Sequence, residues 1–167
     1  QLTADLAHAV TVEDVGRVTV EHLMQYLGAI AGNVYIYHAG DNVIEMLYSK
    51  ADMTPQEREL LLRFPADSSY PMGDVVKHHR PLLFSSFEER IAAYPLTEQF
   101  SHEAPGALMV LPLVVASEVF GVISIMFLDS RTFAESEQTF ISSLVFQCAQ
   151  AIERARLADQ ASELAVM

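Results

Sequence analysis

The stretch from Leu111 to Leu157 decides the fold, and it reads LPLVVASEVFGVISIMFLDSRTFAESEQTFISSLVFQCAQAIERARL. An apolar run over residues 107–115 and a second over 119–128 meet at a short turn around residues 116–118. Runs that are apolar at nearly every position are typical of strands buried on both faces. After Phe133 the apolar and small residues recur at helical spacing. The stretch therefore predicts a buried hairpin followed by a long helix over 135–166.

The chain upstream shows the signals of another helix, another hairpin and a short helix. Thr11 stands three residues before Asp14, as in a capping box, and Gly28 ends the apolar repeat of a helix over 11–28. The segments NVYIYHAG and VIEMLYSK, joined at residues 40–42, are rich in β-branched and aromatic residues and predict a hairpin. The sequence TPQE over 54–57 has the cap, proline and acid of a helix start, which predicts a short helix to about Phe64.

The segment from residue 65 to residue 105 is irregular, with prolines at positions 65, 71, 81, 95 and 105. We expect it to hold one short strand at 82–84 and two or three short helices. The whole pattern predicts an α+β fold with a central, largely antiparallel sheet of about five to six strands. The terminal helices should cover one face of the sheet, and the segment 54–105 should lie on the other. No repeat or linker divides the chain, so a single domain over 1–167 is expected.

Composition excludes several classes of partner. The 167 residues carry 22 acidic and 10 basic side chains, a net charge of −12 at pH 7. This charge balance disfavours binding to nucleic acid or to an anionic membrane, because both kinds of partner are bound by clustered Lys and Arg side chains. No apolar run reaches the roughly 18 residues that span a bilayer, and no signal-peptide pattern opens the chain. The single cysteine fits a reducing cytoplasm, and the start at Gln1 predicts a fragment of a longer polypeptide.

Four short patterns follow one another in a fixed order. They are Pro112-Leu113 in one strand, Gly121-Val122-Ile123 in the next, FAESE over 133–137 at the start of the last helix, and AQAIERARL over 149–157. Together with the upstream segments, this order resembles the GAF domain, in the variant common in multidomain bacterial histidine kinases and in regulators carrying a PP2C-type phosphatase. The resemblance implies a GAF-like fold and a non-catalytic sensory role in signal transduction. It also implies that a bound small molecule acts on an output domain through the last helix.

Five side chains are candidates for contact with a ligand. Tyr35 and Tyr37 lie two apart on one strand and therefore share a face. Val34 and Ile36, which alternate with them, should point to the terminal helices, and this leaves the tyrosines facing the 65–105 segment, which roofs the ligand cavity in GAF domains. Asn33 and Tyr48 are expected to join that face, and Ser124 is a lone hydroxyl in an apolar strand. An apolar pocket with a few polar groups suits a small ligand; the alternative is that the tyrosines only fill the core.

Other kinds of site have weaker support. The six histidines lack metal-ligand spacing. No anchoring cysteine for a bilin is evident, and Phe127-Leu128-Asp129 replaces the Asn-Lys of cyclic-nucleotide GAF domains, so no cofactor can be named. An enzyme of the sulfoxide-reductase type is a distant alternative, since its chemistry needs several cysteines. Cys148 lies at core spacing within the last helix and is expected to be a buried, inert thiol.

The last helix also carries a stripe of small residues, comprising Cys148, Ala151, Ala155, Ala158 and Ser162. Small residues allow two helix backbones to approach closely, so the stripe predicts a homodimer that forms through the terminal helices. The alternative is a long helix packed on its own sheet with a solvated tail. A further alternative for the whole chain is a ligand-free module for dimerisation and relay.

Overall fold

The computed structural model describes residues 2–9, 11–100 and 105–165. Its strands are β1 (Ala31–His38), β2 (Val43–Lys50), β3 (Arg63–Pro65), β4 (Leu82–Phe84), β5 (Leu108–Val115) and β6 (Glu118–Met126). Its helices are α1 (Leu2–His8), α2 (Val12–Leu27), α3 (Pro55–Leu62), α4 (Pro71–His78), α5 (Phe87–Ala93), the short 3-10 helix η1 (Pro95–Phe100) and α6 (Glu135–Ala165). All strand pairs are antiparallel, in the order β3-β2-β1-β6-β5-β4. The α+β class and the antiparallel sheet expected from the sequence are confirmed.

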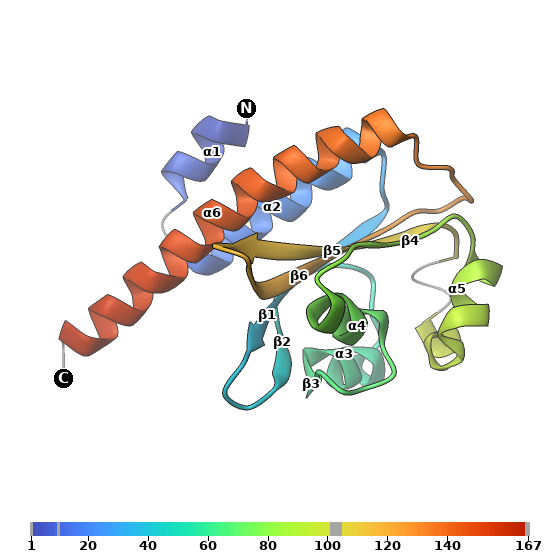
Figure 1. Cartoon of the computed structure of the whole chain (residues 1–167), viewed down its shortest axis with the longest axis horizontal. Helices are drawn as coiled ribbons and strands as arrows, with labels where there is room; N and C mark the ends of the chain where they lie inside the picture. Colours follow the sequence, from blue (N-terminus) through green and yellow to red (C-terminus); the bar gives the residue numbers. More distant parts are fainter. Residues whose placement is uncertain (1, 10, 101–104, 166–167) are drawn as a thin grey trace.

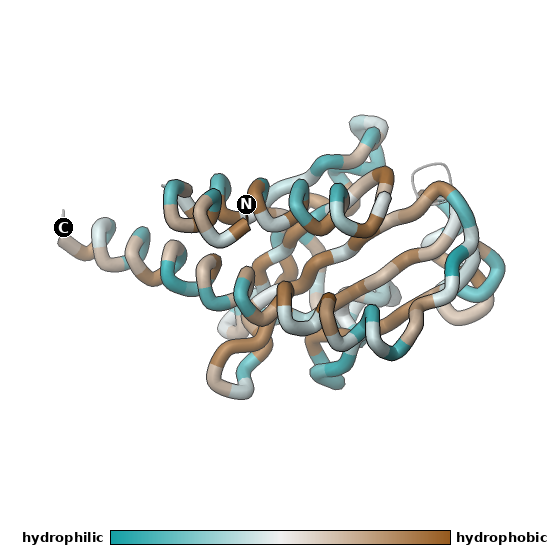
Figure 2. The backbone as a smooth tube through the Cα atoms, turned by 90° about the horizontal axis from the view of Figure 1, so that it is seen from above, coloured by the Kyte–Doolittle hydropathy of each residue, from teal (hydrophilic) through white to brown (hydrophobic). Residues whose placement is uncertain are grey.

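The sheet separates two layers of helices (Figure 1). Helices α2 and α6 lie side by side on one face, and α3, α4, α5 and η1 lie on the other. The alternation of β1 produces this division, because Val34 and Ile36 join the apolar cluster under α2 and α6 while Tyr35 joins the opposite cluster. The C-terminal turns of α6 extend past the sheet (Figures 1 and 2).

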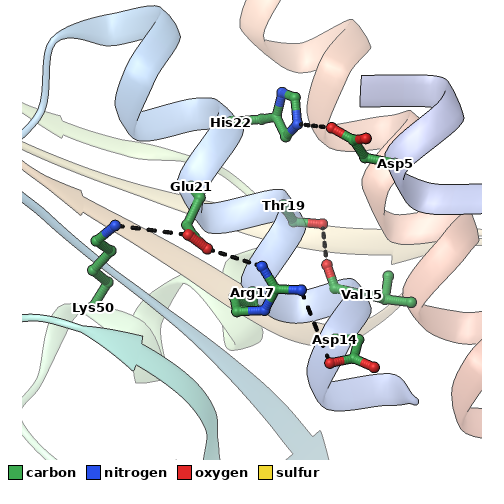
Figure 3. Close-up of polar contacts among 8 residues, drawn as sticks. All are labelled: Asp5, Asp14, Val15, Arg17, Thr19, Glu21, His22 and Lys50. Carbon is green, nitrogen blue, oxygen red and sulfur yellow. Dashed lines mark hydrogen bonds and ion pairs between the residues drawn. The ribbon is translucent and has the colours of Figure 1, made fainter. Parts of the chain in front are cut away.

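Helix α2 begins and ends as its sequence predicts. Thr11 accepts a hydrogen bond from the Asp14 backbone N–H, and Gly28 closes the helix with a φ of 69°. On the outer side of α2, Glu21 contacts Arg17 at 3.1 Å and Lys50 of β2 at 3.6 Å (Figure 3). These contacts attach α2 to the edge of β2.

Helix α1 was not predicted from the sequence. It packs on α2 through Leu6, which is buried, and through a 2.7 Å contact between Asp5 and His22 (Figure 3). This hydrogen bond lowers the pKa of the Asp5 carboxyl from its usual value. A helix of seven residues is less than two turns long and gives little periodic signal, so α1 depends on tertiary contacts that the local sequence does not reveal.

The helix expected over 54–64 ends earlier than predicted. It stops at Leu62, and Arg63–Pro65 forms the edge strand β3, in which Phe64 pairs with Ile44. Pro65 is the physical cause, because a proline disfavours helical geometry in the residue before it. The last helix spans Glu135–Ala165, close to the predicted 135–166; residue 166 lies outside the described part of the chain.

The turn between β5 and β6 offers a test of the hairpin. Ala116 and Ser117 both have positive φ, 52° and 65°, as a two-residue type I′ turn requires. Asn and Gly tolerate this region better than Ala and Ser. The double substitution Ala116→Asn/Ser117→Gly should therefore raise the free energy of unfolding by about 1 kcal/mol, measured by urea denaturation. Ala116→Val should have the opposite effect, and a loss of stability in the Asn-Gly variant would contradict the turn geometry.

Candidate functional site

A small cavity lies between the sheet and the covering helices. Its volume is about 50 Å³. The sheet contributes Asn33 and Tyr35 from β1 and Ser124 from β6, while Arg90 comes from α5 and Thr97 from η1. The remaining lining side chains are mostly apolar. The cavity lies under the 65–105 segment, where a pocket was expected.

Buried polar side chains concentrate around this cavity. Six polar or charged residues are buried in the part of the chain that the structure describes, and four of them, Asn33, Arg90, Thr97 and Ser124, line it. Burying polar groups costs free energy unless they are hydrogen-bonded, so such a concentration requires a physical reason.

Asn33 and Ser124 face each other across β1 and β6 as directly paired residues. The amide oxygen of Asn33 accepts a short hydrogen bond from Ser49, at 2.5 Å, and its amide nitrogen donates weakly to the Ser124 hydroxyl oxygen at 3.4 Å. Among the described hydrogen bonds, Ser124 acts only as an acceptor. Its hydroxyl proton is therefore available to another acceptor in the cavity.

Arg90 is the most unusual residue of the site. Its side chain is only 2% exposed, and its Nε and Nη2 atoms have no hydrogen-bond partner among residues 2–9, 11–100 and 105–165. The guanidinium carbon lies 5.4 Å from the centre of the Phe87 ring, one turn earlier on α5. Burial lowers the pKa of the guanidinium, but arginine is so basic that the group stays protonated. The cavity wall thus contains a positive charge.

Arg90, Thr97 and Tyr70 also line the cavity but were not predicted as site residues. Arg90 follows two glutamates in the segment FEERIAA, and charged side chains are mostly exposed, so the sequence gives no signal that Arg90 is buried. Tyr70 precedes α4 and lines the cavity with its ring edge-on to Phe64 at 5.1 Å. Burial raises the pKa of the Tyr70 hydroxyl. The only sequence signal for Tyr70 was its aromatic character within the expected cap.

The five predicted ligand residues separate into three groups. Asn33, Tyr35 and Ser124 line the cavity, as expected. Tyr37 shares the face of Tyr35 but lies farther along β1, outside the cavity, and donates a hydrogen bond to Asn42 at 2.8 Å. Tyr48 faces the terminal helices, so the expectation that it joins the cavity face is wrong.

The displacement of Tyr48 has a local cause. The register between β1 and β2 shifts by one residue, so that Val34 pairs with Tyr48 and Tyr35 pairs with Met46. Leu47 is the extra residue of this bulge, and both Leu47 and Tyr48 pack towards α2 and α6. A bulge reverses the alternation of faces along a strand, which the period-2 argument did not include.

Cys148 lies in the core of the terminal-helix layer and is fully buried. Burial raises the pKa of its thiol, and a hydrogen bond with Thr19 opposes this shift. A buried, protonated thiol is a poor nucleophile. Ala151 is buried in the same cluster, so the expectation that Cys148 and Ala151 form a face for a second subunit is wrong. Both residues pack within their own domain, because small side chains let α6 approach α2.

No helix among residues 2–9, 11–100 and 105–165 is long and apolar enough to cross a membrane. Over the same residues, no group of three or more His, Cys, Asp or Glu side chains is arranged to hold a metal ion.

Several solved structures share this fold. A GAF domain of a phosphoenolpyruvate-protein phosphotransferase from Coxiella burnetii has a TM-score of 0.76 at 21% identity and covers 96% of this chain and 93% of its own. Residues 122 to 287 of a methyl-accepting chemotaxis protein have a TM-score of 0.73 at 17% identity, and the match covers 95% of this chain and 98% of that structure. The GAF-B domain of DevS from Mycobacterium smegmatis has a TM-score of 0.66 at 15% identity, and the match covers 89% of this chain and 98% of that structure.

Sequence comparison gives the family directly. No curated protein matches the chain significantly. The family model described as "GAF domain" matches residues 9–153, which span α2, all six strands and the core-packed part of α6. The chain belongs to the GAF domain family.

Proposed function

We propose that this GAF domain is a non-catalytic sensory module that binds a small molecule in the cavity beneath α4, α5 and η1. The observation that carries the proposal is the gathering of four buried polar side chains at this cavity. One similar structure comes from a methyl-accepting chemotaxis protein, a signalling protein, which supports a sensory role. The buried state of Cys148 favours this role over that of a thiol-dependent enzyme.

The strand β6 offers a direct route from the cavity to the terminal helix. Ser124 lines the cavity, while its neighbours Ile123 and Ile125 pack in the cluster under α2 and α6. A movement of β6 on one face therefore changes the packing surface on the other. Close-packed interiors transmit such shifts, because they have no slack to absorb them. The ligand would act on α6 in this way, and α6 would bias an output domain.

Ligand binding is testable with a thermal-shift screen of small metabolites. Ser124→Leu fills the cavity and removes a hydroxyl, so it should abolish the shift produced by a cavity ligand. Ile125→Val, one residue away on the opposite face, is the matched control and should keep it. A hit that shifts the Ser124→Leu variant as strongly as the wild type would place its binding site elsewhere.

The relay has a separate test. Hydrogen exchange of α6 amides, measured with and without a cavity ligand, should change over the residues that pack on β5 and β6. Unchanged exchange along the whole of α6 at saturating ligand would contradict the relay, even if binding is real.

We also propose that the domain forms a homodimer through the exposed part of α6. Leu157 and Leu164 are 52% and 71% exposed and lie seven residues apart, which places them on one side of the helix. An apolar pair at heptad spacing on a projecting helix suits pairing with a second copy. This observation favours a dimerising relay module, an arrangement compatible with ligand binding.

Two double variants distinguish the possible faces of α6. Leu157→Glu/Leu164→Glu should convert the dimer to a monomer, because it places four carboxylates at the helix pair. Ala158→Glu/Ser162→Glu adds the same charge to the small-residue stripe and should leave the dimer intact. Analytical ultracentrifugation gives the mass of each. A wild type that is monomeric at high concentration would refute the dimer.

A further inference from the structure

We propose that the cavity ligand is a small aliphatic carboxylate held by the guanidinium of Arg90. This inference rests on the proposed sensory function and specifies its ligand class. Arg90 is almost completely buried and lines the cavity, and two of its nitrogens lack hydrogen-bond partners in the part of the chain that the structure describes. A carboxylate would supply the missing acceptors.

The two unpaired nitrogens of Arg90 are Nε and Nη2. In arginine the N–H bonds of these atoms are parallel and form one edge of the planar guanidinium. A carboxylate accepts both hydrogen bonds at once along such an edge, in the bidentate geometry that makes Arg–carboxylate pairs strong and specific. The unsatisfied part of Arg90 is thus a complete binding unit for this group.

The charge distribution favours an anion over a neutral ligand. No Asp or Glu is among the described residues that line the cavity, although the chain as a whole carries a net charge of −12. Glu57 is the other charged residue that is buried in the described part of the chain, and it lies at the start of α3, where one of its oxygens accepts a hydrogen bond from the Thr54 backbone N–H. Arg90 therefore gives the cavity a local positive charge within an acidic protein.

Size and charge together favour a small monocarboxylate. A volume of about 50 Å³ accommodates only a few water molecules, whereas drug-sized ligands need several hundred. One cation balances one negative charge, so a carboxylate suits Arg90 better than a doubly charged phosphate. The hydroxyl proton of Ser124 and the hydroxyl of Tyr70 are further donors on the cavity wall.

The test uses the Nε–H signal of Arg90 in a ¹H–¹⁵N spectrum of the whole chain. Its loss in Arg90→Met assigns the signal. Acetate, propionate and pyruvate are titrated at constant ionic strength, with acetamide and propionamide as neutral analogues and inorganic phosphate as a second anion. At least one carboxylate should shift the signal saturably, and the amides should not. Backbone shifts around the cavity should show binding at least about 30-fold weaker in Arg90→Met.

Two variants make the comparison specific. Arg80→Met removes the same charge from an exposed position and should bind as the wild type does. Arg90→Lys keeps the charge but loses the bidentate edge, so its affinity for the carboxylate should fall between those of the wild type and Arg90→Met. If Arg90→Met fails to fold, the comparison of carboxylate with amide in the wild type still decides the question.

Several outcomes would overturn the inference. They are equal binding of carboxylates and amides, unchanged carboxylate binding in Arg90→Met, a response to phosphate alone, or no response of the Arg90 signal to any carboxylate. If neutral compounds bind in the cavity, the proposed sensory function stands without the anion. If no compound of either kind binds here and none shifts the melting temperature in the screen, both proposals fail.

Discussion

Replacing Gly121 by alanine should lower the free energy of unfolding by about 3 kcal/mol. A Cβ at this position would lie 2.4 Å from the carbonyl oxygen of Tyr35 and 2.9 Å from a methyl group of Leu113. Gly121 sits in β6, between its partners Ile36 of β1 and Leu113 of β5, so neither neighbouring backbone has room to retreat. Relief of the contact with Tyr35 would require displacement of β1, one of the strands that line the cavity.

Gly40→Ala is the matched control for this substitution. A Cβ at Gly40 meets no atom within 4 Å, and the residue lies in the exposed turn between β1 and β2. The stability of this variant should stay within about 1 kcal/mol of the wild type. Urea denaturation measures both variants. A loss below 1 kcal/mol for Gly121→Ala would mean that β1 and β6 are more loosely packed than the structure shows.

Replacing Arg90 by methionine should raise the stability of the ligand-free protein by about 1–2 kcal/mol. A buried charge without a partner opposes folding, and an unbranched apolar side chain of similar length removes that penalty while it retains the packing. The gain should accompany the loss of carboxylate binding. This combination is the expected signature of a residue that is kept for binding at the expense of stability.

Arg131 provides the comparison for Arg90. Its guanidinium contacts Glu137 at 2.6 Å and lies 4.8 Å from the centre of the Phe127 ring. Because this arginine is paired, Arg131→Met should lower the stability by about 1–2 kcal/mol. Chemical denaturation in a chloride buffer without carboxylates gives both values. If Arg90→Met is also destabilising, the packing of its side chain against Phe87 stabilises the fold more than the burial of its charge opposes it.

Features with a local cause could be predicted from the sequence. The capping box at Thr11 and the stop at Gly28 define α2, and the alternation in β1 correctly assigned Tyr35 to the cavity and its aliphatic neighbours to the helices. The Gly-Val-Ile pattern at 121–123, which contributed to the recognition of the family, now has a structural explanation. Its glycine permits the close approach of β1.

Features that depend on contacts between distant segments could not be predicted. The bulge at Leu47 turned Tyr48 to the other face, because hairpin register is a property of two strands rather than of one. The burial of Arg90 results from the docking of α5 and η1 against the sheet, which no pattern within α5 encodes. The cavity therefore lies where a pocket was expected, but the expected lining was incomplete in chemistry. Its apolar wall and hydroxyl groups were foreseen, and its charge was not.

The projecting end of α6 has a thermodynamic consequence. Every residue from Leu157 to Ala165 is exposed, so no tertiary burial supports these last turns. Helical segments of this length have little stability of their own in water, and their hydrogen bonds open and close on a timescale far shorter than that of global unfolding. The free energy needed to unwind, extend or rotate this end is therefore close to thermal energy. Whatever the end of α6 contacts will determine its conformation, and even a weak bias from the sheet would be enough to redirect it.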